Sequence, residues 1–250
     1  MTRMDFLLIA PELWVVTMTC VILFVDLFLK EERRAIIHLL AMVTLVFAAI
    51  ITLRGDYSAD PTAAVLAFNG TFVRDQMGDM LKLFSYFVLA MVFVYAKFFL
   101  RESRMFRSDF YTLSLEALLG IMLLISANNL VMVYLGLELL ALASYTLVAY
   151  ARDSSRGTEA AMKYFVLGSR ASGILLYGMS MIYGATGTLD LIEIAEAVKV
   201  TGSDDIMLVF GLVFLVVSLA FKFGAVPFHM WVPDVYQGAP VSTTLFISSV

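Results

Sequence analysis

The stretch FKFGAVPFHMW, residues 221–231, decides the fold. It begins where a run of sixteen uncharged residues, Ile206–Phe221, meets Lys222. As a helix, that run is about 24 Å long, which is shorter than the roughly 30 Å of hydrocarbon in a bilayer. We therefore expect Lys222 and the residues after it to lie inside the membrane, at a break in a helix.

Composition makes lipid the solvent for most of this chain. Hydrophobic residues make up 61% of its 250 residues, against roughly 45–50% in ordinary soluble domains. Charged residues make up only 15%, and the mean hydropathy is +0.90. A large water-soluble domain is thereby excluded. The net charge of -4, with no basic run, gives no support to a nucleic-acid partner.

The sequence offers no residues for redox or metal chemistry. Cys20 is the only cysteine, so an internal disulfide and a multi-cysteine metal or iron–sulfur site are excluded. There is no Gly-rich phosphate loop, metal-ligand spacing or nucleophile triad. We expect no catalytic, cofactor-binding or metal-binding residue in this chain.

Seven stretches are long and apolar enough to cross a bilayer, which takes about 20 residues each. They are residues 6–29, 34–53, 79–100, 110–127, 130–150, 162–184 and 206–228. An eighth begins near Val241 and is cut off at Val250, so the chain looks like the front part of a longer protein. Residues 54–80 are the one long loop, expected to be an external connection. The prediction is an all-α, polytopic transmembrane helix bundle with a discontinuous seventh helix.

Positively charged residues predict the orientation, because lysine and arginine gather in cytoplasmic loops. The loops after spans one, three and five carry ten of them: Lys30, Arg33, Arg34, Lys97, Arg101, Arg104, Arg107, Arg152, Arg156 and Lys163. The N-terminus and the loops after spans two, four and six carry five: Arg3, Arg54, Arg74, Lys82 and Lys199. We therefore expect the N-terminus to lie outside.

Two ionisable residues at membrane depth are candidates for proton translocation, because such residues are usually paired and functional. Glu138 lies about 12 Å into its span, near the bilayer middle. It suits a proton-carrying carboxylate, with a protonated packing residue as the alternative. Lys222 suits proton transfer, with a lysine snorkelling to the interface as the alternative. Counted by the helical rise per residue from the outer end of each span, the depths of Glu138 and Lys222 differ by about 12 Å, so contact is not established.

The residues after Lys222 contain the expected break and a further titratable group. Gly224 and Pro227 fall where the helix can be interrupted, because proline lacks an N–H and clashes with the preceding turn. His229 follows the break and suits proton exchange with the cytoplasm, since histidine titrates near neutral pH. A structural histidine near the interface is an equal alternative.

Arg170 and Glu116 are two further ionisable residues inside spans. Arg170 is about 12 Å from the cytoplasmic end of its span, and Glu116 is about 9 Å from the same side. Their matched depths predict a structural ion pair between spans four and six.

Three motifs resemble the subunit N family of bacterial NADH:quinone oxidoreductase, respiratory complex I. They are LGLELLALASYTLVAY (135–150), EAAMKYFVLGSRASGILLYGMSMIYGATGT (159–188) and FKFGAVPFHMWVPDVYQGAPVSTTLF (221–246). The resemblance extends to the segment APELWVV (10–16) and covers most of the chain, which looks like the N-terminal half of such a subunit. Mrp-type cation/proton antiporters share the general form of the third motif.

The resemblance implies an antiporter-like fold with three leading helices in residues 1–109 and a first, truncated repeat in residues 110–250. It implies proton translocation through Glu138 and Lys222, whereas Arg170 and Glu116 depart from the family pattern. Partners would be other membrane subunits of complex I, especially neighbouring antiporter-like ones, in a hetero-oligomer of the bacterial inner membrane. Flavin and iron–sulfur clusters would reside in partner subunits. A stand-alone Mrp-type antiporter subunit and a purely structural membrane subunit are the alternatives.

Overall fold

The computed structural model describes residues 3–29, 35–55, 64–103, 105, 107–201 and 205–249. Several residues used above lie outside these ranges: Lys30, Arg33, Arg34, Arg104 and Val250. The elements are α1 (Arg3–Leu8), α2 (Ala10–Phe28), α3 (Ala35–Arg54), β1 (Val65–Ala67), β2 (Phe72–Arg74), α4 (Gln76–Glu102), α5 (Ser108–Ile125), α6 (Leu130–Val148), α7 (Ser155–Thr186), α8 (Leu191–Thr201), α9 (Ile206–Lys222), α10 (Trp231–Gly238) and α11 (Val241–Ser249).

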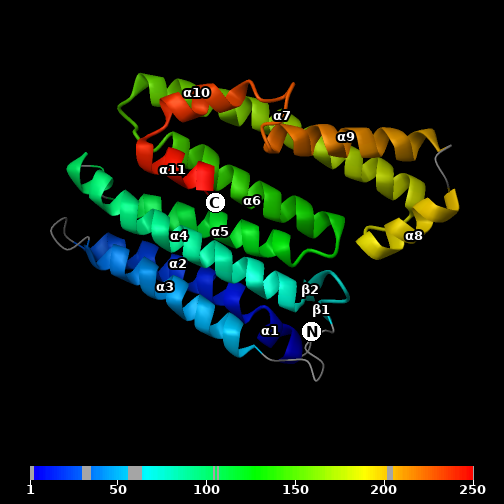
Figure 1. Ribbon diagram of the computed structural model, residues 1–250, viewed down its shortest axis with the longest axis horizontal. Helices are drawn as coiled ribbons and strands as arrows, with labels where there is room; N and C mark the ends of the chain where they lie inside the picture. Colours follow the sequence, from blue (N-terminus) through cyan, green and yellow to red (C-terminus); the bar gives the residue numbers. More distant parts are fainter. Residues whose placement is uncertain are drawn as a thin grey trace.

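The helices form one bundle of adjacent long rods (Figure 1). Helix α2 packs on α3 and α5, α5 packs on α6, α6 on α7, and α7 on α9. Within the described ranges, six helices are long and apolar enough to cross a membrane: α2, α3, α4, α5, α6 and α7. The chain is therefore a multi-pass membrane protein.

The seventh span, expected over residues 206–228 with a break after Lys222, is discontinuous as predicted. Helix α9 has 17 residues and ends at Lys222, and the short helix α10 follows only at Trp231. Helix α7 differs from its expected bounds, because it has 32 residues and begins seven residues before the expected start at Met162. Its first turns carry charges, which a helix tolerates where it projects beyond the hydrocarbon.

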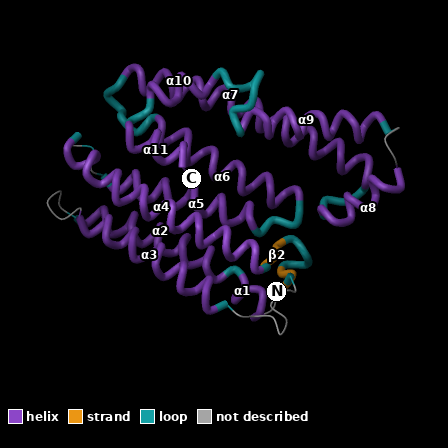
Figure 2. Tube along the Cα trace, in the orientation of Figure 1, coloured by secondary structure: helices purple, strands orange, loops and turns teal. Residues whose placement is uncertain are grey.

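The loop expected over residues 54–80 contains a β-hairpin (Figure 2). Strands β1 and β2 pair antiparallel, with Leu66 opposite Val73. The hairpin is bonded to the turn between α5 and α6, because Val73 N donates to Ser126 O at 2.9 Å. The same turn bonds to the segment before α8, since Leu130 N donates to Leu189 O at 2.9 Å. Backbone hydrogen bonds thus join three connections at one end of the bundle.

Polar caps set where the helices begin. An Asp, Asn or Ser before the first turn accepts a hydrogen bond from a backbone N–H that would otherwise lack a partner. The caps with such a bond are Asp75 on α4, Asn129 on α6, Ser154 on α7 and Asp205 on α9. At its other end α7 stops at Gly187, whose φ of 74° is the left-handed conformation that glycine adopts easily.

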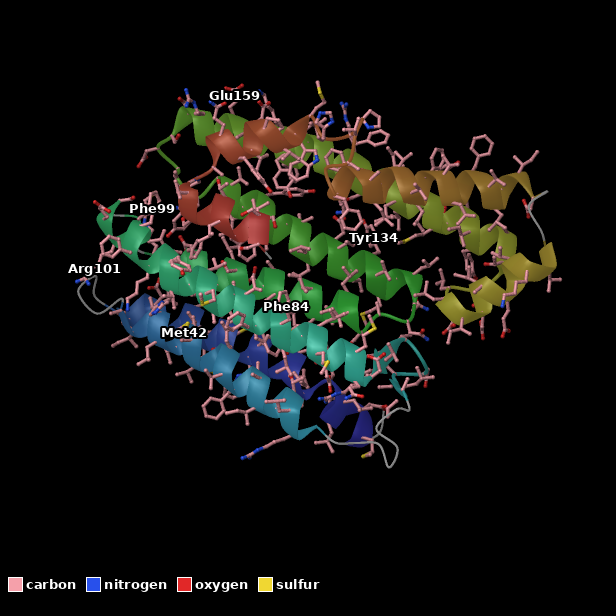
Figure 3. The ribbon with its side chains drawn as sticks, viewed as in Figure 1. Met42, Phe84, Phe99, Arg101, Tyr134 and Glu159 are labelled. Carbon is pink, nitrogen blue, oxygen red and sulfur yellow. The ribbon has the colours of Figure 1, made fainter. Side chains whose placement is uncertain are left out.

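The side chains are arranged as expected for a chain that is surrounded mainly by lipid (Figure 3). Charged residues such as Arg101 and Glu159 lie near helix ends, whereas Phe84 on α4 is 65% exposed on the outside. The largest core cluster takes residues from both sides of residue 110, for example Leu89 and Leu118. The two regions expected from the resemblance, 1–109 and 110–250, thus share one core, and their division stays a proposal.

Two glycine contacts bring neighbouring helices unusually close. A side chain at Gly136 of α6 would place its Cβ 2.9 Å from the backbone O of Gly120 on α5. A side chain at Gly178 of α7 would meet the backbone O of Gly211 on α9 at the same distance. Small residues at such positions let transmembrane helices approach closely enough for extensive van der Waals contact.

Gly136→Val is expected to destabilise the protein by about 1–3 kcal/mol, because the side chain would force α5 and α6 apart. Thermal unfolding of the detergent-solubilised protein, followed by circular dichroism, measures this. The matched control is Gly173→Ala, since a Cβ at Gly173 meets nothing within 4 Å. Equal melting temperatures for the two variants would contradict the packing role of Gly136.

Candidate functional site

Three helices bring a carboxylate, a hydroxyl and an ammonium group together. Glu138 lies in the middle of α6, Ser172 on α7 and Lys222 at the last residue of α9. Lys222 Nζ lies 3.4 Å from Glu138 Oε1 and 3.5 Å from Ser172 Oγ. Ser172 Oγ in turn donates a hydrogen bond to Glu138 Oε1. The two residues expected to carry protons are thus in contact.

The site is mostly enclosed. The side chain of Glu138 is 20% exposed and that of Lys222 is 15% exposed, whereas Ser172 is buried. Lys222 also lines a cavity of about 530 Å³, whose walls come from α5, α6, α7, α9, α10 and α11. The other lining residues are largely apolar, with hydroxyl groups from Ser144, Tyr145, Tyr164 and Tyr236. The cavity is large enough to hold water molecules beside Lys222.

The expected 12 Å difference in depth between Glu138 and Lys222 does not exist, because α6 and α9 do not begin at the same level. The C-terminal part of α7 extends past the first turn of α6, and α9 starts from that far position (Figure 1). The sixteen residues before Lys222 therefore begin further out than the eight residues before Glu138. A depth calculated from the sequence assumes that every helix starts at the same plane, so it cannot detect this offset.

The break follows directly after Lys222. Gly224 has a φ of 64°, which ends the helix, and its N–H donates to Phe221 O at 3.0 Å. Pro227 lies within the non-helical residues 223–230. Trp231 opens α10, and its Nε1 donates to Phe221 O at 3.0 Å across the break. The same indole stacks on Tyr164 of α7, with ring centroids 4.6 Å apart. The break thus has defined contacts on both sides.

His229 lies in the non-helical segment, and its backbone O accepts a hydrogen bond from Val232 N at 3.0 Å. Its side chain is half-buried. Among the described residues, no contact joins His229 to Glu138 or Lys222. Its role in proton exchange stays a prediction.

Arg170 and Glu116 are not brought together. Arg170 is exposed on α7, in a shallow groove that is also lined by Tyr177 of α7 and Phe214 of α9. Glu116 is half-buried on α5. The ion pairs of the described residues do not include this pair. The reason is rotation: Arg170 precedes the inward-facing Ser172 by two residues, about 200° around the helix. The depths matched, but the predicted ion pair is wrong.

A second buried Glu–Lys pair was missed by the sequence analysis. Lys82 Nζ lies 2.6 Å from Glu12 Oε1, and these side chains are 1% and 2% exposed. Lys82 also lies over the ring of Phe72, 5.1 Å from its centroid. The orientation count had placed Lys82 in a loop, but it lies inside α4. Glu12 and Lys82 are near the starts of their helices, where a sequence does not distinguish buried from solvated charges.

Arg74 was also placed in that loop, and it too is buried. Its guanidinium pairs with Asp79 at 3.1 Å and donates to Thr52 O at 3.0 Å. Together with Glu12 and Lys82, these contacts connect α2, α3, α4 and the hairpin. No group of three or more His, Cys, Asp or Glu residues in the described part of the chain is arranged to hold a metal ion.

Lys82→Met is expected to destabilise the protein by about 3–5 kcal/mol, because it leaves the Glu12 carboxylate buried without its cation. The double variant Glu12→Gln/Lys82→Met should recover much of that loss. Unfolding in detergent measures both. Lys199→Met, at an exposed position of α8, is the control. The pair has no structural role if Lys82→Met behaves like this control.

The separation of Arg170 and Glu116 predicts that their substitutions act independently. The stability changes of Glu116→Gln and Arg170→Leu should add in the double variant to within about 0.3–0.5 kcal/mol, as for sites without shared partners. A double-mutant cycle by thermal unfolding measures this. A coupling well above that range would mean that the two charges meet after all.

Comparison with known proteins shows which sequences and structures this chain resembles. Residues 127–250 match the family model described as "NADH:quinone oxidoreductase/Mrp antiporter, TM". NADH-quinone oxidoreductase subunit N of Thiobacillus denitrificans is 51% identical over 250 residues, which cover 100% of this chain and 51% of that protein. The corresponding subunit of Thioalkalivibrio sulfidiphilus is 48% identical over 246 residues, which cover 98% of this chain and 50% of that protein.

Solved structures share the fold. A chain of respiratory complex I from Thermus thermophilus with bound aureothin has a TM-score of 0.76 and 28% identity, over 96% of this chain and 50% of that one. A chain of the Mrp complex from Dietzia sp. has a TM-score of 0.77 and 20% identity, over 99% of this chain and 46% of that one. The chain spans about half the length of the curated relatives it matches. Along nearly its whole length the chain is thus similar to about half of NADH-quinone oxidoreductase subunit N, and its residues 127–250 match the antiporter-like family model.

Proposed function

We propose that this chain is part of a proton-translocating membrane subunit of NADH:quinone oxidoreductase, in which Glu138 and Lys222 carry protons. The observation that supports this most directly is their contact at 3.4 Å beside a cavity, where α9 is interrupted. Charged residues at membrane depth mark ion pathways, and non-helical backbone there needs protein or water around it. Gly224 and Pro227 provide the interruption.

The mechanism is electrostatic. While Glu138 and Lys222 are in contact, the carboxylate stabilises the charged ammonium, and separation removes that stabilisation. A change of conformation at the break would separate them, and Lys222 would then release its proton into the cavity. His229, further along the break, would exchange protons with the cytoplasm. Redox chemistry would take place in partner subunits that hold flavin and iron–sulfur clusters.

The assignment to a respiratory complex rests on the curated relatives, which are named as subunit N at 46–51% identity. The description of the family model also names Mrp antiporters, so a cation/proton antiporter subunit is the second candidate. Sodium-dependent transport without any NADH dehydrogenase partner would favour it. The likeness to the Mrp structure, at 20% identity, bears on the fold alone.

The proposed setting is the bacterial inner membrane, with the N-terminus outside. The positive-inside count supports this orientation, although Lys82 no longer belongs in it because it is buried in α4. The partners would be other membrane subunits of the complex, especially neighbouring antiporter-like subunits. Residues 110–250 would then form the first antiporter-like repeat and residues 1–109 the helices that precede it.

Lys222→Ala in the full-length parent protein is expected to abolish NADH-driven proton uptake by inverted membrane vesicles, because the carrier of the proton is removed. NADH oxidation is followed in the same samples, and a native gel measures the assembled complex. Lys199→Ala, on the exposed part of α8, is the matched control. Unchanged proton uptake per NADH in assembled Lys222→Ala complex would make Lys222 a structural residue and the proposal wrong.

A further inference from the structure

The carboxylate of Glu138 has two partners, and they differ in how firmly they are held. We propose that Ser172 is the fixed partner of Glu138 and Lys222 the movable one, so that Ser172 is a positioning residue for proton release. This inference rests on the proposed function. It assigns a role to a side chain that carries no charge and that the sequence motifs did not single out.

Both partners use the same carboxylate oxygen. Ser172 Oγ donates to Glu138 Oε1, and Lys222 Nζ lies 3.4 Å from that oxygen and 3.5 Å from the serine hydroxyl. A hydroxyl can donate one hydrogen bond and accept others at the same time. Ser172 therefore bonds to the carboxylate whether or not Lys222 is present.

Ser172 and Glu138 lie on uninterrupted helices that are packed on each other. The distance between α6 and α7 is fixed close to these two residues, because Tyr145 of α6 packs against Gly168 of α7. A side chain at position 168 would collide with the tyrosine ring. Lys222 is different, since it is the final residue of α9 and residues 223–230 after it belong to no helix. A rearrangement of that segment can move Lys222 without moving α6 or α7.

The fixed hydrogen bond makes separation of the charges possible. An ionised carboxylate that loses its only partner in a low-dielectric interior becomes strongly unfavourable. With Ser172 still bonded, Glu138 keeps one charge-assisted hydrogen bond when Lys222 leaves. Such a bond is worth about tenfold to a hundredfold in an equilibrium constant. Once Lys222 has left, the ammonium no longer compensates the carboxylate charge, so the serine bond stabilises the separated state more than the paired state and thereby raises the population of the separated state.

The other buried Glu–Lys pair of this protein lacks this arrangement. Glu12 and Lys82 are 2.6 Å apart and almost fully buried, and both belong to continuous helices. The hydrogen bonds of the described residues give Glu12 no hydroxyl donor. Two pairs of the same residue types therefore differ in separation, exposure and the presence of a third partner. Only the pair at the break has the features needed for exchange.

The test compares Ser172→Ala with Ser172→Thr in the full-length protein within its complex. In inverted vesicles, Ser172→Ala should lower NADH-driven proton uptake per assembled complex by up to about tenfold, because only the part of the hydrogen-bond energy that differs between the paired and separated states changes their ratio. Ser172→Thr, which keeps the hydroxyl on the same carbon, should restore most of the uptake. Ser218→Ala is the matched control, because Ser218 is buried on α9 and its one hydrogen bond among the described residues goes to Phe214 O of its own helix.

Infrared spectroscopy supplies a readout that does not depend on pumping. The carboxyl bands of Glu138 are assigned by their loss in Glu138→Gln, and Ser172→Ala should shift them. If Glu138→Gln itself leaves pumping intact, the proposed function fails. If Glu138→Gln abolishes pumping while Ser172→Ala changes neither the bands nor the uptake, only this inference fails. A band shift with unchanged uptake, or a loss of assembled complex alone, would also overturn it.

Discussion

The contact between the Glu138 carboxylate and the Lys222 ammonium, with the Ser172 hydroxyl as third member, is the interaction on which the site depends. Glu138 and Lys222 meet at 3.4 Å because α9 starts beyond the first turn of α6 and stops at the depth of the carboxylate. The long helix α7 makes that offset possible, and glycine contacts hold α7 to α9. The caps and close helix packing thus serve to place two opposite charges at one point inside the membrane.

The same pair of residue types occurs twice in this chain with different consequences. Glu12 and Lys82 form a short, nearly inaccessible ion pair between continuous helices, which suits a permanent link. Glu138 and Lys222 form a longer, partly exposed pair beside a cavity and a helix end. Burial makes a charge pair costly to break, so a pair that exchanges protons needs access to water and another hydrogen-bond donor. Environment, not residue type, separates the structural pair from the pair that we propose to exchange protons.

The interruption after Lys222 connects local backbone chemistry to the site. Gly224 adopts a left-handed conformation and Pro227 cannot continue a helix, so α9 ends where the lysine lies. Trp231 then bonds back to Phe221 O and stacks on Tyr164, which holds the second helix fragment against α7. The break is therefore a defined part of the structure, and it directly follows the charge that we propose to move.

Composition and hydropathy by themselves determined the membrane class and most of the spans. They also identified Glu138 and Lys222 as charges at membrane depth, because the length of apolar stretches and the positions of charges can be read from the sequence alone. The contact between them, the partner role of Ser172 and the burial of Lys82 were decided by tertiary structure. Each depends on the offset and rotation of one helix relative to another. Rotation also explains why Arg170 and Glu116, matched in depth, do not meet. Arg170 lies two positions before the inward-facing Ser172 on α7, and residues two positions apart on a helix face nearly opposite directions.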